Sequence, residues 1–176
     1  VCLPCWEDTG AVYWVFSTAF RGNIQEYREL LWDRERGFVQ VREGTTDVQF
    51  SLRTEQVLAY RNNMPVVNPA PLVERAYKAF MEDKYWLFPA ATLSETGVTR
   101  KGAHYGDELA LRVDYANRSF FPGDNYLWFV RVSGLPYGWK MWRADYPVKG
   151  LWMTFEKWIT LETGAREAVT ARSAHA

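Results

Sequence analysis

The sequence contains few of the residues on which catalytic and metal centres usually depend. Among its 176 residues are only two cysteines and two histidines, and His175 lies next to the C-terminal residue. A zinc site needs several Cys, His or carboxylate ligands, and a hydrolytic triad needs a base beside a nucleophile. His104, close to Gly102 and Gly106, is expected at an exposed strand or turn. We therefore expect no catalytic residue, no metal and no cofactor, which disfavours an enzyme without deciding the question.

The two cysteines do not make a convincing redox centre. Cys2 and Cys5 have Cys-x-x-Cys spacing with Pro4 between them, as in thioredoxin-type motifs. Such a motif needs a preceding strand and a following helix that lowers the thiol pKa. Here it lies at the start of the chain, before a segment rich in strand formers. We interpret both as terminal thiols, free or locally paired, of a trimmed mature form or of a fragment.

Basic and acidic residues are equally frequent, and the sequence contains no long apolar run. Lys and Arg number 21, as do Asp and Glu, so the net charge is zero. Without a net charge there is no long-range field to attract nucleic acid or an anionic membrane. Arg131, Lys140 and Arg143 near aromatic strands could favour stacking on a single-stranded nucleic acid, but the zero net charge argues against this partner. No run approaches the roughly 20 apolar residues of a membrane-spanning helix.

Aromatic residues, by contrast, are abundant. Nine Trp, ten Tyr and ten Phe make up 16% of the chain, and 48% of all residues are hydrophobic. This composition indicates a large internal surface, and the length suits one domain with a sizeable core. We expect a single domain over residues 1–176, with residues 1–9 and 170–176 poorly ordered.

One predicted strand, residues 126–130, is apolar on both of its faces. Because strand side chains alternate, Tyr126, Trp128 and Val130 should point to one side of the sheet. Leu127 and Phe129 should point to the other. A strand at the wall of a two-layer domain usually presents one polar face to water. Both faces must therefore be covered, or one of them must line an apolar molecule.

The N-terminal third has the pattern of an antiparallel meander. Short polar turns, such as 21–23 and 43–46, separate segments rich in strand formers. Connections this short join antiparallel neighbours rather than parallel strands. The strands are expected at residues 11–20, 24–32, 38–42, 48–52 and 56–60.

A helix is expected to follow these strands. Asn68 suits an N-cap, and Pro69 and Pro71 fall where the first helical turn tolerates proline. Apolar residues recur at helical spacing from Leu72 to Met81, with charged residues between them. The segment 83–88 predicts a further helical turn that Pro89 ends. An amphipathic helix of this kind must lie on the sheet.

Strands resume after Gly97 and complete the predicted fold. They are expected at residues 98–105, 109–115, 126–132, 139–146, 151–161 and 168–172. Open twisted sheets of about ten strands tend to curl. The predicted fold class is therefore α+β: a strongly curved, open antiparallel half-barrel of ten or eleven strands, with a helical plug on its concave face.

Several segments, taken in order, carry a family resemblance. They are Leu31-Trp32-Asp33-Arg34 with Gly37, Tyr77-Lys78-Ala79-Phe80 with Asp83, Tyr85-Trp86-Leu87, Gly97-Val98, Gly123-Asp124-Asn125-Tyr126-Leu127-Trp128 and the strand with Trp142. This order resembles a group of uncharacterised bacterial proteins in the outer-membrane lipoprotein carrier (LolA/LolB-like) superfamily. The resemblance covers most of residues 30–165, and it rests on order and spacing.

The resemblance implies both a fold and a location. It implies a half-barrel whose interior can hold acyl chains or another apolar ligand, and export to the periplasm or the cell surface. Peripheral contact with a membrane or a lipoprotein is a further implication. It supplies no catalytic residue. Phe88-Pro89 stands where the family has Met-Pro, and Val132-Ser133-Gly134 where it often has Asp and Gly. Both departures concern the ligand more than the fold.

An apolar cavity is the most specific functional hypothesis from the sequence. Its expected lining combines sheet and helix residues: Trp14, Phe16, Tyr77, Phe80, Met81, Trp86, Trp128, Val130, Trp139 and Met141. Ligand pockets are mostly apolar with a few convergent polar groups. The alternative is that the same residues pack together as a filled core.

Three functions stay open at this point. The leading one is non-enzymatic binding of a lipid, an acyl chain or another hydrophobic small molecule. The second is a structural or partner-binding module with a filled core, which an exposed apolar patch would favour. The third is a small enzyme that uses the concave pocket, which an inward cluster such as Tyr115, Arg143 and Asp145 would favour. The sequence does not give the oligomeric state.

Overall fold

The computed structural model describes residues 3–88, 92–116 and 121–173. The chain divides into two compact units. The N-terminal unit is Glu7–Lys84, and the C-terminal unit is Tyr85–Ala176 together with Val1–Trp6. Each unit contains one open six-stranded sheet in which sequence neighbours pair. A mainly antiparallel β fold with few helices is therefore confirmed, while the single domain stays a prediction.

The N-terminal sheet is a simple meander. Its strands are β1 (Ala11–Phe20), β2 (Asn23–Asp33), β3 (Phe38–Glu43), β4 (Thr46–Ser51), β5 (Val57–Arg61) and β6 (Met64–Pro65). The first five follow the sequence prediction closely. β6 was not expected: Asn62 and Asn63 have positive φ angles of 51° and 61°. Asn tolerates this region, so a two-residue turn joins the paired Arg61 and Met64.

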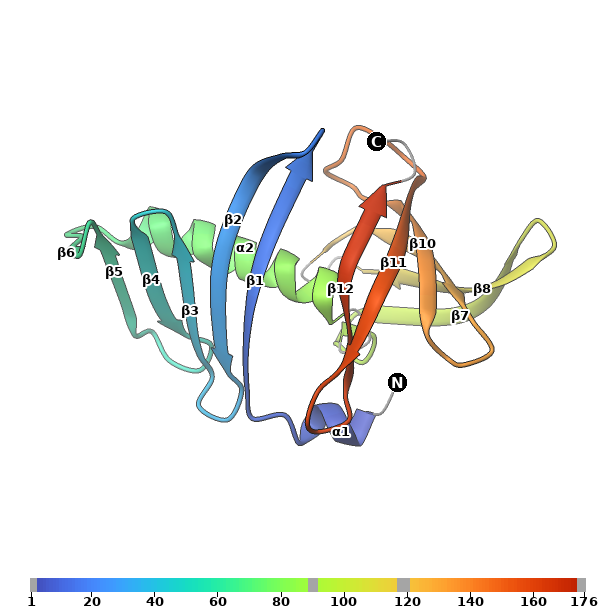
Figure 1. The fold of residues 1–176 in the computed structure, drawn as a ribbon, viewed down its shortest axis with the longest axis horizontal. Coiled ribbons are helices and arrows are strands. Elements are labelled where there is room, and N and C mark those ends of the chain that lie inside the picture. The colour runs from blue at the N-terminus through green and yellow to red at the C-terminus, as the bar shows by residue number, and fades with distance from the viewer. Residues whose placement is uncertain (1–2, 89–91, 117–120, 174–176) are drawn as a thin grey trace. The chain divides into compact units, whose positions relative to one another are not determined.

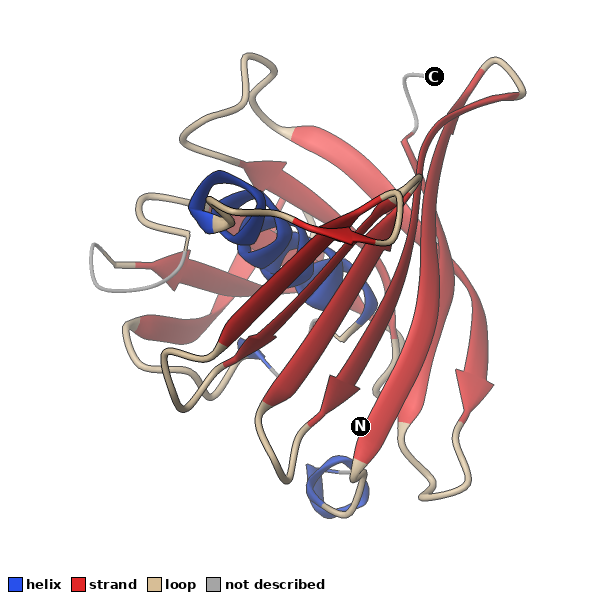
Figure 2. Cartoon of the chain, turned by 90° about the vertical axis from the view of Figure 1, so that its left-hand side faces the viewer, coloured by secondary structure: helices blue, strands red, loops and turns tan. Residues whose placement is uncertain are grey.

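Helix α2 (Ala70–Leu87) follows this sheet and contributes its first fifteen residues, Ala70–Lys84, to the N-terminal unit. The carbonyl of Pro69 accepts hydrogen bonds from the amides of Leu72 and Val73, which closes the first turn. Figures 1 and 2 show α2 along one face of the β1–β6 sheet. The helix is confirmed, and it runs through residues 83–87 where a separate turn was expected.

The core of the N-terminal unit lies between α2 and this sheet. Leu30 of β2, Val39 of β3 and Phe80 of α2 are fully buried. The strands alternate as the pattern requires: in β3 and β4 the buried positions are Val39, Val41, Val48 and Phe50. One face of the sheet is therefore apolar and is covered by the helix.

The C-terminal unit is a second meander. Its elements are α1 (Leu3–Glu7, of which Leu3–Trp6 belong to this unit), β7 (Val98–Tyr105), β8 (Glu108–Tyr115), β9 (Asn125–Val130), β10 (Pro136–Trp142), β11 (Leu151–Thr160) and β12 (Arg166–Ser173). The helix at Leu3–Glu7 and the strand to Ser173 differ from the poorly ordered ends that the sequence suggested. Cys5 of α1 is disulfide-bonded, and Cys2 lies outside the described residues.

The β9–β10 hairpin differs from its predicted bounds for a visible reason. β9 ends at Val130, because the amide of Arg131 bonds the carbonyl of Leu135 in the connecting turn. The register shifts between Pro136 and Gly138 on β10, which leaves one extra residue opposite β9. The bulge lets β10 begin three residues before the predicted Trp139.

Gly138 provides a test of the packing on this sheet. A Cβ atom at Gly138 would lie 2.7 Å from Cζ2 of Trp152 and 3.0 Å from the carbonyl oxygen of Met153. Because that backbone oxygen cannot move away easily, we expect Gly138→Ala to lower the free energy of unfolding by about 1–3 kcal/mol. Denaturant unfolding followed by Trp fluorescence measures the change.

The matched control is Gly102→Ala in β7, where an added Cβ meets nothing within 4 Å. We expect its effect to stay within about 0.5 kcal/mol. Equal stability of the two variants would show that Trp152 does not lie against Gly138.

Candidate functional site

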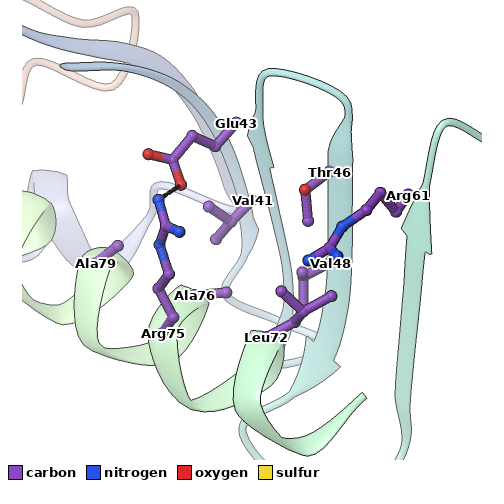
Figure 3. A pocket seen from close by; sticks show the side chains of 9 residues that line it. All are labelled: Val41, Glu43, Thr46, Val48, Arg61, Leu72, Arg75, Ala76 and Ala79. Carbon is purple, nitrogen blue, oxygen red and sulfur yellow. Dashed lines mark hydrogen bonds and ion pairs between the residues drawn. The ribbon is translucent and has the colours of Figure 1, made fainter. Parts of the chain in front are cut away.

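A small hollow lies between the first half of α2 and strands β3, β4 and β5, within the N-terminal unit. Its volume is about 50 Å³, and we call it the α2 hollow. Figure 3 shows its lining, which is Val41, Glu43, Thr46, Val48, Arg61, Leu72, Arg75, Ala76 and Ala79. Five of these nine side chains are apolar and four are polar or charged, so the lining of the hollow is mixed. Ligand sites combine an apolar wall with polar groups that fix orientation, and both kinds of group are present here.

The hollow exists because small side chains face each other there. Val41 and Val48 are paired across β3 and β4 and are both buried. Opposite them, α2 presents Ala76 and Ala79. Short side chains on both sides leave space that a larger residue would fill, as Phe80 does one position further along the helix.

Phe80 fills the space next to the hollow. Its ring lies 6.2 Å from that of Trp14, 5.4 Å from that of Trp32 and 6.1 Å from that of Phe50. Tyr77 reaches Phe50 at 5.9 Å but is 39% exposed. The predicted lining residues Trp14, Tyr77 and Phe80 are therefore brought together on α2 and its sheet, as a packed ring cluster beside the hollow.

The two cations of the lining come from different elements. Arg75 of α2 donates to Glu43 of β3 at 2.6 Å, in a pair that is largely exposed and contributes little stability. The side chain of Arg61, at the end of β5, makes no hydrogen bond or ion pair with the described part of the chain. Figure 3 shows its guanidinium reaching over Val48 and Leu72. One cation at the hollow is paired and the other is not.

The other half of α2 is held on the sheet by a buried ion pair. Arg28 of β2 donates from Nε and Nη2 to both carboxylate oxygens of Asp83, at 3.0 and 2.9 Å. Asp83 is 1% exposed and Arg28 is 8% exposed. Burial raises the pKa of Asp83 to about 6, against the opposing effect of the Arg28 guanidinium. The guanidinium also lies 5.1 Å from the centre of the Phe16 ring, another predicted lining residue.

The sequence reasoning missed this pair, although one signal was present. Asp83 follows Phe80 by three residues and Ala76 by seven, which places it on the buried face of the helix. A charge at such a position requires a partner. Arg28, 55 residues earlier, could not be identified as that partner without the fold.

The predicted lining residues of the C-terminal unit, apart from Val130, form a filled core. The ring of Trp139 lies 5.6 Å from that of Trp128, 5.0 Å from that of Trp86 and 4.7 Å from that of Phe155. Met141 is buried in the same cluster. In this unit the rings pack against one another, as the filled-core alternative predicts.

Met81, a predicted lining residue of the N-terminal unit, is half-buried.

Val130 does not share the burial of Trp128, although both were expected on one covered face. It is 42% exposed because it is the last residue of β9, where the turn to β10 begins. The opposite face of β9 is covered too. Phe129 is 1% exposed and lies 4.9 Å from the ring of Trp152 and 6.1 Å from that of Tyr105. The two-sided apolar strand thus meets aromatic rings on both faces.

Tyr115, Arg143 and Asp145, the cluster that would favour an enzyme, do not all point into the core. Tyr115 is buried and shares a hydrogen bond with Thr92 at 3.1 Å, and burial raises its pKa to about 12. Asp145 is exposed and binds Arg143 at 3.0 Å. The buried carboxylate is instead Asp124, which accepts from the hydroxyl of Tyr126 at 2.9 Å and the amide of Ala144 at 2.8 Å. These contacts connect strands and loops of the core.

Other kinds of site are absent from the described residues. Within residues 3–88, 92–116 and 121–173, no group of three or more His, Cys, Asp or Glu side chains could hold a metal ion. In the same ranges, no helix has the length and apolar character that crossing a membrane requires. His104 of β7 is exposed, as expected.

Comparison with known proteins gives no match: no family model, no curated protein and no solved structure is similar to this chain. The candidate site therefore rests on the geometry described above.

The Arg28–Asp83 pair predicts a large effect of a single substitution. We expect Asp83→Ala to lower the free energy of unfolding by about 3 kcal/mol, because the buried Arg28 guanidinium loses both of its short hydrogen bonds and keeps only the more exposed Glu26, at 3.5 Å, as a counter-charge. The double variant Arg28→Met with Asp83→Met should recover most of that loss. Glu74→Gln on the exposed face of α2 is the control, with an effect within about 0.5 kcal/mol. An Asp83→Ala protein as stable as this control would contradict the pairing.

Glu167 of β12 predicts a pH dependence of stability. It is 7% exposed, and its Oε1 atom has no hydrogen-bond partner within the described residues. Burial raises its pKa from 4.5 to about 7. The folded state therefore favours the protonated carboxyl. Burial of this carboxyl therefore costs no stability below pH 4.5, where it is protonated in both states. The free energy of unfolding then falls as the pH rises from 4.5 through about 7.

We expect Glu167→Gln to be more stable than the wild type at pH 8. The substitution should abolish the fall in the free energy of unfolding, up to roughly 3 kcal/mol, that the wild type shows as this carboxyl ionises. Thermal unfolding at several pH values measures it. Glu162→Gln, in the exposed turn before β12, should keep the wild-type dependence. A Glu167→Gln profile parallel to that of the wild type would exclude this carboxyl as the cause.

Proposed function

We propose that this protein is a non-enzymatic binder of a lipid, an acyl chain or another apolar small molecule, taken up between α2 and the β1–β6 sheet. The observation that carries the proposal is the α2 hollow, an unfilled space of about 50 Å³ beside a core that rings otherwise fill. The apolar part of its lining is formed by Val41, Val48 and Leu72 together with two alanines of α2.

The hollow must widen to accept such a ligand. Sites for small molecules usually enclose about 300–1,000 Å³, several times the volume of the hollow. The contacts of α2 indicate where widening is least costly. Around Ala76 and Ala79 the helix buries small side chains and makes an exposed ion pair through Arg75, and both stabilise little. Around Phe80 and Asp83 it makes ring contacts and the buried ion pair.

The ligand then displaces the first half of α2 while the second half stays in place. The chain of an acyl ligand would extend from the hollow toward the ring cluster, where Trp14, Tyr77 and Phe80 lie. Phe16 and Met81 are the remaining predicted lining residues of this unit. In this proposal the rings around Trp139 act as core, because they already contact one another.

The resemblance to the lipoprotein-carrier superfamily supports the same function and supplies the finer features of the proposal. These are a half-barrel with a helical plug on its concave face, a location in the periplasm or at the cell surface, and peripheral contact with a membrane or a lipoprotein. Packing of α2 on one face of an antiparallel sheet is consistent with this fold (Figure 2).

A pocket-filling variant tests the site. We expect Ala79→Leu to weaken binding of a fluorescent fatty acid by about tenfold, because the larger side chain occupies the hollow and removes apolar contact area worth about 1.4 kcal/mol. A fluorescence titration of the purified protein measures the dissociation constant. Extraction followed by mass spectrometry identifies any apolar molecule that co-purifies.

The matched control places the same side chain on the neighbouring, exposed position, as Lys78→Leu. It should bind like the wild type. Unchanged binding by Ala79→Leu would move the site elsewhere, and a wild-type protein without saturable binding and without a co-purified apolar molecule would overturn the proposed function.

A further inference from the structure

We infer that the molecule bound at the α2 hollow is an amphipathic monoanion, a single-chain carboxylate whose head group is bound by Arg61. The inference rests on the proposed function and specifies its ligand. It starts from the side chains that line the hollow, which include two arginines and only one acidic residue, Glu43. Arg75 is paired with that glutamate, so one positive charge at the hollow is uncompensated.

Arg61 differs in this respect from neighbouring arginines of the same unit. Arg28 binds Asp83, Arg42 binds Asp47 at 2.9 Å, and Arg75 binds Glu43. Among the described residues, Arg61 has no such partner. Its guanidinium nevertheless lies over apolar side chains of the hollow rather than away from the protein (Figure 3). An unpaired guanidinium above an apolar surface is suited to a ligand that has one anionic end and one apolar end.

A second donor lies next to Arg61. Thr46 is its cross-strand partner in the β4–β5 ladder, and the side chains of both residues line the hollow. A guanidinium fork and a hydroxyl on adjacent strands can together donate to the two oxygens of a carboxylate. The two-residue turn at Asn62 and Asn63 follows directly and fixes the end of β5.

The charge and the space favour a carboxylate over other head groups. A phosphate monoester carries close to two negative charges at neutral pH, whereas the hollow has one uncompensated positive charge. A bilayer surface is recognised by clusters of several basic residues, and here a single cation is unpaired. The hollow of about 50 Å³ holds roughly two water-sized groups. The first methylenes of the chain therefore contact Val48 and Leu72 while the carboxylate stays at Arg61.

Calorimetric titration of the full chain with three probes of equal chain length tests the inference. The probes are sodium laurate, dodecanol and dodecyltrimethylammonium, each below its aggregation concentration. We expect laurate to bind at least about tenfold more tightly than dodecanol, because the carboxylate carries the opposite charge and offers two acceptor oxygens to the guanidinium, whereas the hydroxyl is neutral and offers one. The cationic probe should bind most weakly.

Substitution of the arginine completes the test. Arg61→Gln should weaken laurate binding by about tenfold or more and should weaken dodecanol binding much less, because only laurate loses an opposite charge. The laurate affinity of Arg61→Lys should lie between those of the wild type and Arg61→Gln, since lysine keeps the charge but lacks the planar fork of the guanidinium. Arg42→Gln is the control, because Arg42 is also exposed but is paired with Asp47 and does not line the hollow; this variant should bind laurate like the wild type. Circular dichroism confirms that each variant is folded.

The outcomes separate the inference from the function on which it rests. Equal affinity of the wild type for laurate and dodecanol, or unchanged laurate binding by Arg61→Gln, overturns the carboxylate assignment and leaves apolar binding standing. Failure of the wild type to bind any of the three probes overturns both. Laurate preference that is lost in Arg61→Gln and kept in Arg42→Gln supports the assignment.

Discussion

The buried pair of Arg28 and Asp83 sets the position of α2 on the N-terminal sheet. An isolated buried charge is far too costly to keep, so Asp83 requires Arg28, whose other acidic neighbour, Glu26, is more exposed and lies further away, at 3.5 Å. Their two hydrogen bonds, at 3.0 and 2.9 Å, leave little freedom in the helix at that point. Phe80, one turn earlier, is surrounded by rings from β1, β2 and β4. The register of the helix on the sheet follows from these two residues, and so does the position of every other side chain along it.

The first half of the helix has a different character as a consequence. With Phe80 and Asp83 in place, Ala76 and Ala79 face the paired valines of β3 and β4, and their short side chains leave the hollow. A core of this kind could have been filled by leucines at the same helix positions. The space is therefore a property of two alanines and of the register, and the exposed pair between Arg75 and Glu43 does little to close it. Tight attachment at one end and loose packing at the other is the arrangement that lets a helix yield to a ligand.

Local pattern was sufficient for most of the fold. Period-two alternation and polar turns gave the meander order, and helical spacing gave α2 within a few residues. What failed depended on tertiary context. The bulge beside Gly138 displaced the start of β10, and the position of Val130 at the end of its strand left it exposed. The candidate site was predicted only in part: Trp14 and Phe80 do lie together, but the hollow and the unpaired Arg61 depend on which strands face which helix turn.

The packing around the two-sided apolar strand β9 is the reason for which the proposed site is assigned to the helix-covered sheet of the N-terminal unit. From sequence, Leu127 and Phe129 required either a cover or a ligand. The structure places Tyr105 and Trp152 around Phe129, and places Trp139 and Phe155 behind Trp128. Every large ring that suggested an apolar cavity in this sheet thus already has ring partners, and a ligand there would have to replace contacts of near-crystalline density. At the proposed site a ligand disturbs only the contact of the partly exposed Tyr77 ring with Phe50, so the same apolar contact area gives more net binding energy there.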